Sequence, residues 1–127
     1  WYNNIMIFIK GGKKKQRDLA ENAACFAINK LFPKFRKYSI LIRLNKFNDC
    51  FEYDDREFVI NIDKKQNCDD FLTAIFHELV HVKQYLKNEM DNYSFRTFTD
   101  YYILPQEQEA YLVQEELLNL WDIEKKN

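Results

Sequence analysis

A hairpin pattern in the middle of the chain is the feature that most restricts the fold. Two short apolar segments, 51–53 and 58–62, flank the polar tripeptide Asp54-Asp55-Arg56. Strands joined by so short a turn pair antiparallel to each other. This pattern favours an α+β fold over a doubly wound parallel sheet.

Two further strands and a helix are predicted before the hairpin. Residues 5–9 are apolar and are followed by Gly11-Gly12, and residues 38–44 are rich in β-branched and apolar side chains. Between them, apolar residues recur at helical spacing up to about residue 30. Asp18 is the predicted N-cap of this helix.

Two more helices are predicted after the hairpin. Asn67 or Asp69 caps a long helix that runs to about residue 87, and Pro105 suits the first turn of a helix that runs to about residue 125. The stretch 88–104 has no clear periodicity. We therefore expect a single α+β domain over residues 1–127. Its small, mostly antiparallel sheet of three to four strands packs with an N-terminal, a central and a C-terminal helix.

The charge balance restricts the class of partner. The chain has 19 Lys and Arg against 20 Asp and Glu, so its formal net charge is −1. A near-neutral domain is not built for broad neutralisation of phosphates, so nucleic acid is not the expected partner. The basic segment Lys13, Lys14, Lys15 and Arg17 is predicted to be a solvated loop. We expect no membrane span, because no apolar run approaches the ~20 residues that crossing a bilayer requires.

The cysteines indicate a reducing compartment. Cys25, Cys50 and Cys68 are odd in number and widely spaced, and no two of them have CxxC spacing. This usage is typical of thiols that are not paired in disulfides. We therefore expect a cytoplasmic protein, located in the host cytoplasm or the virion if the chain is viral.

The predicted central helix carries an HExxH motif. His77 and His81 are the two histidines of the chain, and Glu78 follows the first of them. Residues four apart on a helix share a face, so both imidazoles can bind one ion. A zinc ion there lowers the pKa of its water to about 7, and the adjacent carboxylate accepts the proton as the water attacks a carbonyl.

The rest of this helix supports a metal site over a purely structural pair of histidines. An apolar stripe defines its packing face, and its members are Leu72, Ile75, Leu79, Val82 and Leu86. At about 100° per residue, His77 lies about 180° and His81 about 140° from the centre of this stripe. The pattern predicts a helix that packs through the stripe and lines a cleft with its histidines.

A catalytic zinc site uses three protein ligands and keeps one position open. With no third histidine, the remaining ligand must be a carboxylate or, less favoured, Cys68. The best source is the start of the last helix, where Glu107 and Glu109 point to different sides of an inner face. That face is predicted to contain Ala110, Val113, Leu117, Leu120 and Trp121. Periodicity does not separate Glu107 from Glu109.

The motif followed by Glu107-x-x-Ala110 resembles the gluzincin group of zincin metallopeptidases. In several such families the first Glu of an E-x-x-A segment is the third zinc ligand, so the resemblance implies Glu107. Three segments, 54–58, 77–85 and 105–111, resemble small SprT-like metallopeptidases of bacteriophages and bacteria. The similarity covers roughly residues 38–115. SprT and Spartan proteins proper use a third histidine, which this chain lacks.

The resemblance implies a minimal zincin fold and a zinc-dependent endopeptidase that acts on an extended polypeptide, with Glu78 as general base. It also implies an edge strand that binds substrate as an added strand, a role expected here for the 57–62 arm of the hairpin. A second electrophile usually helps to stabilise the oxyanion. Its candidates are Tyr85, Arg96, Tyr101, Tyr102 and Tyr111, and none is assigned.

Two other functions compete with this prediction. One is a zincin-shaped module that binds zinc or a partner protein without turnover. The retained Glu78 argues against it, because a structural site needs no base and is more often four-coordinate. The other is a nucleic-acid-associated protease that uses the basic segment 13–17, which salt-dependent DNA binding would distinguish.

Overall fold

The structure, a computed structural model, describes residues 5–35, 37–87 and 104–126. These residues form a four-stranded sheet and three helices, which confirms the α+β class. In chain order the elements are β1 (Ile5–Lys10), α1 (Lys14–Leu31), β2 (Tyr38–Asn45), β3 (Asp49–Asp54), β4 (Glu57–Asp63), α2 (Cys68–Leu86) and α4 (Pro105–Lys126).

The pairing of the strands differs from the prediction. The strand order is β1-β2-β4-β3, in which β1 with β2 and β2 with β4 are parallel, and β3 with β4 is antiparallel. The expectation of a mostly antiparallel sheet is therefore wrong. The hairpin itself forms as predicted, but β4 inserts between β2 and β3, and α1 provides the crossover that makes β1 parallel to β2.

The composition of the hairpin strands explains their positions. Residues 58–62 of β4 are buried on both faces of the sheet, which suits a central strand. In contrast, β3 is largely exposed and carries acidic residues, which are tolerated at an edge. The prediction of a free edge at 57–62 is thus wrong, and the free edge on this side of the sheet belongs to β3.

Helix α1 begins earlier than predicted. Gly11 and Gly12 make the turn after β1 with φ of 90° and 66°, and the backbone N–H of Lys13 donates to Gln16 Oε1 at 2.9 Å. The side chain of Arg17 then donates to the carbonyl of Gly12 at 2.7 Å. These contacts start the helix at Lys14, so residues 14–17 are helical rather than a loop and Asp18 is not the N-cap.

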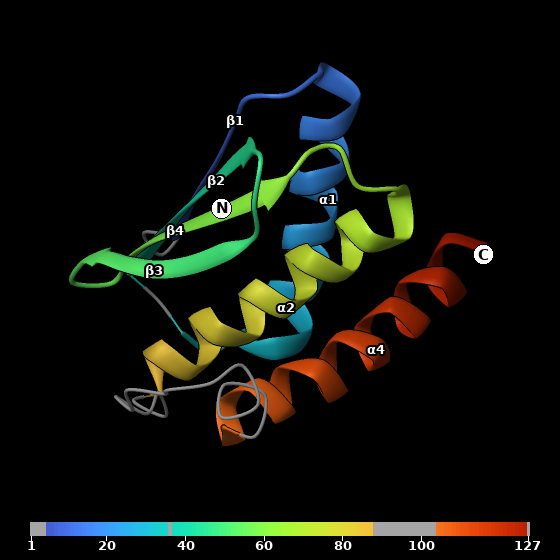
Figure 1. Ribbon diagram of the computed structural model, residues 1–127. Coiled ribbons are helices and arrows are strands. Elements are labelled where there is room, and N and C mark those ends of the chain that lie inside the picture. Colours follow the sequence, from blue (N-terminus) through green and yellow to red (C-terminus); the bar gives the residue numbers. More distant parts are fainter. Residues whose placement is uncertain (1–4, 36, 88–103, 127) are drawn as a thin grey trace.

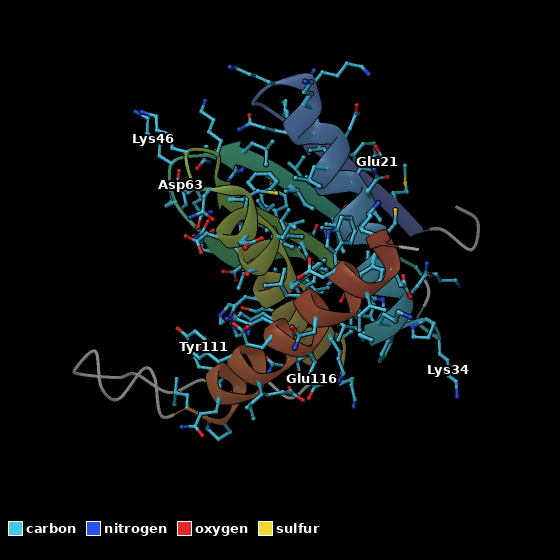
Figure 2. All side chains as sticks on the ribbon, turned by 90° about the vertical axis from the view of Figure 1, so that its right-hand side faces the viewer. Glu21, Lys34, Lys46, Asp63, Tyr111 and Glu116 are labelled. Atoms are coloured by element: carbon cyan, nitrogen blue, oxygen red, sulfur yellow. The ribbon has the colours of Figure 1, made fainter. Side chains whose placement is uncertain are left out.

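The helices form two layers on one face of the sheet. Helices α1 and α2 pack against the sheet, and α4 packs on the side of α2 away from it (Figures 1 and 2). Helix α2 is therefore buried almost all round from Phe71 to Val82. None of the helices in the described part of the chain is long and apolar enough to cross a membrane.

The ends of α2 and α4 follow the sequence closely. Asn67 is the N-cap of α2, and its side chain accepts from the backbone N–H of Asp70 at 2.9 Å. Helix α4 begins at Pro105 and buries Trp121 against the rings of Phe26 and Phe76. Ala110 and Leu117 are buried as predicted, whereas Leu120 is exposed. Most of the aperiodic stretch 88–104 lies outside the described residues.

Candidate metal centre

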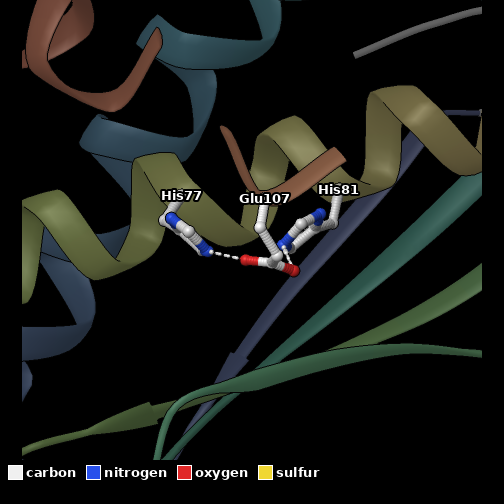
Figure 3. A group of neighbouring side chains, drawn as sticks. All are labelled: His77, His81 and Glu107. Carbon is white, nitrogen blue, oxygen red and sulfur yellow. Dashed lines mark hydrogen bonds and ion pairs between the residues drawn. The ribbon is translucent and has the colours of Figure 1, made fainter. Parts of the chain in front are cut away.

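Helices α2 and α4 together bring three potential ligands to one point. His77 and His81 project from α2 towards the first turn of α4, where Glu107 lies (Figure 3). Their exposed fractions are 9% for His77, 5% for His81 and 5% for Glu107. The predicted turning of the histidines away from the apolar stripe is observed. Helix α4 packs on this second face, and His77 borders a cavity there, whereas His81 is covered.

The carboxylate of Glu107 faces both histidines. Its Oε1 lies 3.1 Å from His77 Nε2, and its Oε2 lies 3.0 Å from His81 Nε2. All three residues offer ligand atoms within 4.8 Å of one another. Tetrahedral zinc ligands at about 2.1 Å from the metal are about 3.4 Å apart, so small shifts would suffice to hold an ion.

Two glutamines set the orientation of the imidazoles. Gln114 Oε1 lies 2.7 Å from His77 Nδ1, and Gln84 Oε1 lies 2.7 Å from His81 Nδ1. Because an amide oxygen can only accept, each Nδ1 carries a proton, and a neutral imidazole then turns the lone pair of Nε2 towards Glu107. The orientation of the Gln84 amide is fixed because its Nε2 donates to the carbonyl of Gln106 and to Glu109 Oε1.

The donor set fits a cation. Two imidazole lone pairs and a carboxylate facing one another are unfavourable unless a positive charge lies between them. Moreover, His81 Nε2 is buried and has no hydrogen-bond partner of good geometry, although Glu107 is close. Two nitrogens and one carboxylate oxygen are ligands that zinc binds readily, which leaves a fourth position open.

Electrostatics within the protein show how tightly these groups are coupled. Burial raises the pKa of Glu107, but contacts with the two histidines in their protonated form, and their positive charge, outweigh burial and lower this pKa to about 2. Burial lowers the pKa of His81, yet its contact with Glu107 outweighs burial and the net shift is upward. The carboxylate is therefore held in the ionised form that metal binding requires.

Glu109 has a different role from Glu107. Its Oε1 accepts from Gln84 at 2.7 Å, and its Oε2 lies 3.9 Å from Lys83 Nζ. The group of three ligand atoms found in the described part of the chain contains neither Glu109 nor Cys68, which is exposed at the start of α2. Glu109 thus fixes the orientation of Gln84, and Gln84 in turn contacts His81.

Glu78 lies beside this group and borders a cavity of about 390 Å³. The carboxyl is buried, which raises its pKa to about 7 although the two histidines oppose the shift. Loops on either side of the β3–β4 hairpin and helices α2 and α4 provide the lining. The lining residues are Asn48, Gln66, Asp70, Thr73, Ala74, His77, Glu78, Tyr111 and Gln114.

The candidate residues for oxyanion stabilisation lie in different places in the structure. Tyr111 lines this cavity, and its ring centroid is 4.8 Å from that of His77. Tyr85 packs its ring against Phe58 instead. Arg96, Tyr101 and Tyr102 lie outside the described residues. Of the two candidates that the structure describes, Tyr111 is the one that lines the cavity beside Glu78.

Gln84 and Gln114, which contact the two histidines, were not predicted from the sequence. Gln84 follows His81 by three residues, and Gln114 follows Glu107 by seven, so each shares a helix face with a predicted ligand. That spacing is the pattern that indicates them. No protein-family model, curated protein or solved structure matches the chain. The chemistry of the site itself therefore carries the functional argument.

Proposed function

We propose that this protein is a zinc-dependent peptidase that cleaves extended polypeptides. The observation that carries the proposal is the convergence of His77, His81 and Glu107 next to the buried Glu78 at the wall of a cavity. A purely structural zinc site more often has four protein ligands and no adjacent base. Three ligands, an open position and a neighbouring carboxylate favour hydrolysis.

In the proposed reaction, a zinc ion and the side chains of the protein have different roles. A bound zinc ion would polarise the substrate carbonyl and lower the pKa of a water molecule. Glu78 accepts a proton from the attacking water and passes it to the leaving amine as the peptide C–N bond breaks. The hydroxyl of that water stays on the carbonyl carbon. Gln84 and Gln114 keep the imidazoles in the tautomer that binds metal.

The free edge of β3 supports a polypeptide substrate. Asp49 and Cys50 at the start of this strand are close enough to Glu78 for their charges to affect each other. Asp49 begins an edge strand whose outer backbone groups can pair with an extended peptide. A substrate bound in this way would pass beside the base.

Replacement of Glu78 with Gln tests the proposed function. This change keeps the size of the side chain and removes its basicity, so we expect unchanged zinc content and fold. Hydrolysis of an unbiased peptide library should fall by about 10²-fold or more. Glu116→Gln is the matched control, because Glu116 is exposed on α4 and should leave the rate unchanged.

Two outcomes would contradict the proposal. Wild-type protein that holds zinc but cleaves nothing across the library would favour the non-enzymatic module. A Glu78→Gln protein that cleaves at the wild-type rate would assign the activity to another site.

A nucleic-acid-associated protease is the second candidate, and one observation favours it. Lys13, Lys64 and Lys65 surround a second cavity, of about 460 Å³, at the start of α1. This cavity shares no lining residue with the cavity beside Glu78. Binding of a DNA duplex that weakens steeply with salt, and weakens further in a Lys64→Glu variant, would support this candidate. For either function we propose a cytoplasmic location, or the host cytoplasm or virion if the chain is viral.

A further inference from the structure

One face of the sheet is not covered by any described element. Helices α1 and α2 pack on the face that carries Ile40, Ile42 and Ile60, as Figure 1 shows. On the other face Met6 and Phe8 of β1 are exposed by 53% and 52%. Neighbouring exposed apolar side chains on an uncovered sheet face form a contiguous patch of the kind that marks an interaction surface.

The strand register arranges the apolar side chains of this face in a row. One residue from each strand contributes, and the four are Phe8, Leu41, Val59 and Phe51, in strand order. Phe8 and Phe51 occupy the two edge strands and are exposed, whereas Val59 in the centre is buried. The row is therefore apolar across the whole width of the sheet, and its exposed side chains lie at the two edges.

The next row on the same face is polar and has opposite charges at its two ends. It consists of Lys10, Arg43, Asn61 and Asp49. Asn61 accepts from Arg43 Nε at 2.9 Å and donates to Asp49 Oδ1 at 2.6 Å, which fixes both charged side chains. Within the described residues neither Lys10 nor Asp49 forms an ion pair.

We propose that this face binds a second copy of the chain in a twofold dimer, with the axis parallel to the strands. Such an axis places β1 over β3 of the partner subunit and β2 over β4 of the partner subunit. Each row then faces the same row of the partner subunit, with the order of the strands reversed. Lys10 meets Asp49 of the partner subunit, and Phe8 meets Phe51 of the partner subunit.

Charge complementarity favours a second copy of the chain as the partner of this face, and it favours a twofold axis parallel to the strands. With the axis parallel to the strands, Arg43 faces the partner's Asn61, and no like charges face each other in either row. A twofold axis perpendicular to the strands and passing over the Phe8 row would turn the charged row onto the row of Met6 and leave Lys10 without a partner. If the same axis passed over the charged row, Lys10 would face Lys10 of the partner subunit. Two sheets stacked face to face at about 10 Å bury such apolar rows well.

The oligomeric state tests this proposal. Sedimentation equilibrium of the full chain, from micromolar to hundreds of micromolar, should show a dimer. Phe8→Asp should give a monomer with an unchanged circular dichroism spectrum. The control is Ile123→Asp, which alters a side chain on α4 that is 57% exposed and should leave the dimer intact.

A charge change and a cross-link test the orientation. Lys10→Glu should weaken self-association by about tenfold or more, because like charges then face each other. The same change at the exposed Lys15 of α1 is the control. A carbodiimide should join Lys10 to Asp49, which within one chain lie three strand spacings, about 14 Å, apart. The link must therefore join two chains.

A wild-type monomer at all these concentrations would overturn the proposal, as would a dimer that survives Phe8→Asp. A dimer in which Lys10 cross-links to other carboxylates but not to Asp49 would overturn the proposed axis. The Lys10–Asp49 link together with a monomeric Phe8→Asp variant is the expected result.

Discussion

The two glutamines behind the histidines determine which nitrogen of each imidazole can bind a metal. Gln114 contacts His77 from α4, whereas Gln84 contacts His81 from within α2. Loss of an outer-shell partner of this kind typically lowers metal affinity about 10- to 100-fold. We therefore expect Gln114→Ala to weaken zinc binding by that factor in competition with a chromophoric chelator.

Gln108→Ala is the matched control for this prediction, because Gln108 lies on the same helix and is exposed. Its zinc affinity should equal that of the wild type. If the two variants bind zinc equally well, the contact with Gln114 does not orient His77.

The sequence allows the site to be predicted only in part. His77, Glu78 and His81 follow from one motif on one helix, because their relative positions depend only on helical geometry. Glu107 follows from the family resemblance, since periodicity left Glu109 equally possible. The distinction depends on how α4 is rotated against α2, which is a tertiary contact between residues about 30 positions apart.

Among the elements, α2 carries both histidines and Glu78, the proposed base, so its start is worth testing. The side chain of Asn67 caps the helix through the N–H of Asp70. Asn67→Ala should lower the free energy of unfolding by about 1 kcal/mol, as measured by urea denaturation.

Asn119→Ala is the control for the cap, because it makes the same chemical change at an exposed position within α4. It should leave the free energy of unfolding unchanged or raise it slightly, since Ala has the higher helix propensity. Equal effects of the two changes would show that Asn67 does not act as a cap.

The strands and helices could be predicted from the sequence, but the order of the strands in the sheet could not. Hydrophobic patterns are local, whereas the pairing of β2 with β4 depends on contacts across the chain. The burial of β4 on both faces was nevertheless visible in its continuous apolar run, and the acidic residues of β3 mark an edge strand. The start of α1 was missed because Lys13 is not a favoured N-cap residue.

At the scale of the whole molecule, the core is separate from the candidate metal centre. It is formed by the inner face of the sheet, the alanine-rich face of α1 and aromatic contacts to Trp121. We therefore expect chelator-treated protein to stay folded. Zinc at about 100 times its Kd should add about 2.7 kcal/mol and raise the melting temperature by several degrees.

Glu107→Ala is the control for this stabilisation, because it should abolish the response of the melting temperature to zinc. Loss of the far-UV circular dichroism signal on chelation would instead indicate that the ion is required for folding. That result would favour a structural over a catalytic role.

A zinc titration of the wild type beside Glu107→Ala and Glu109→Ala is the most direct test of the proposed metal centre. Glu107 faces both imidazoles, whereas Glu109 acts through Gln84. We expect one zinc per wild-type chain and a loss of zinc affinity of about 100-fold or more in Glu107→Ala, with a smaller loss in Glu109→Ala. Wild-type protein that takes up no zinc at micromolar concentration, or a larger loss in Glu109→Ala than in Glu107→Ala, would contradict this expectation.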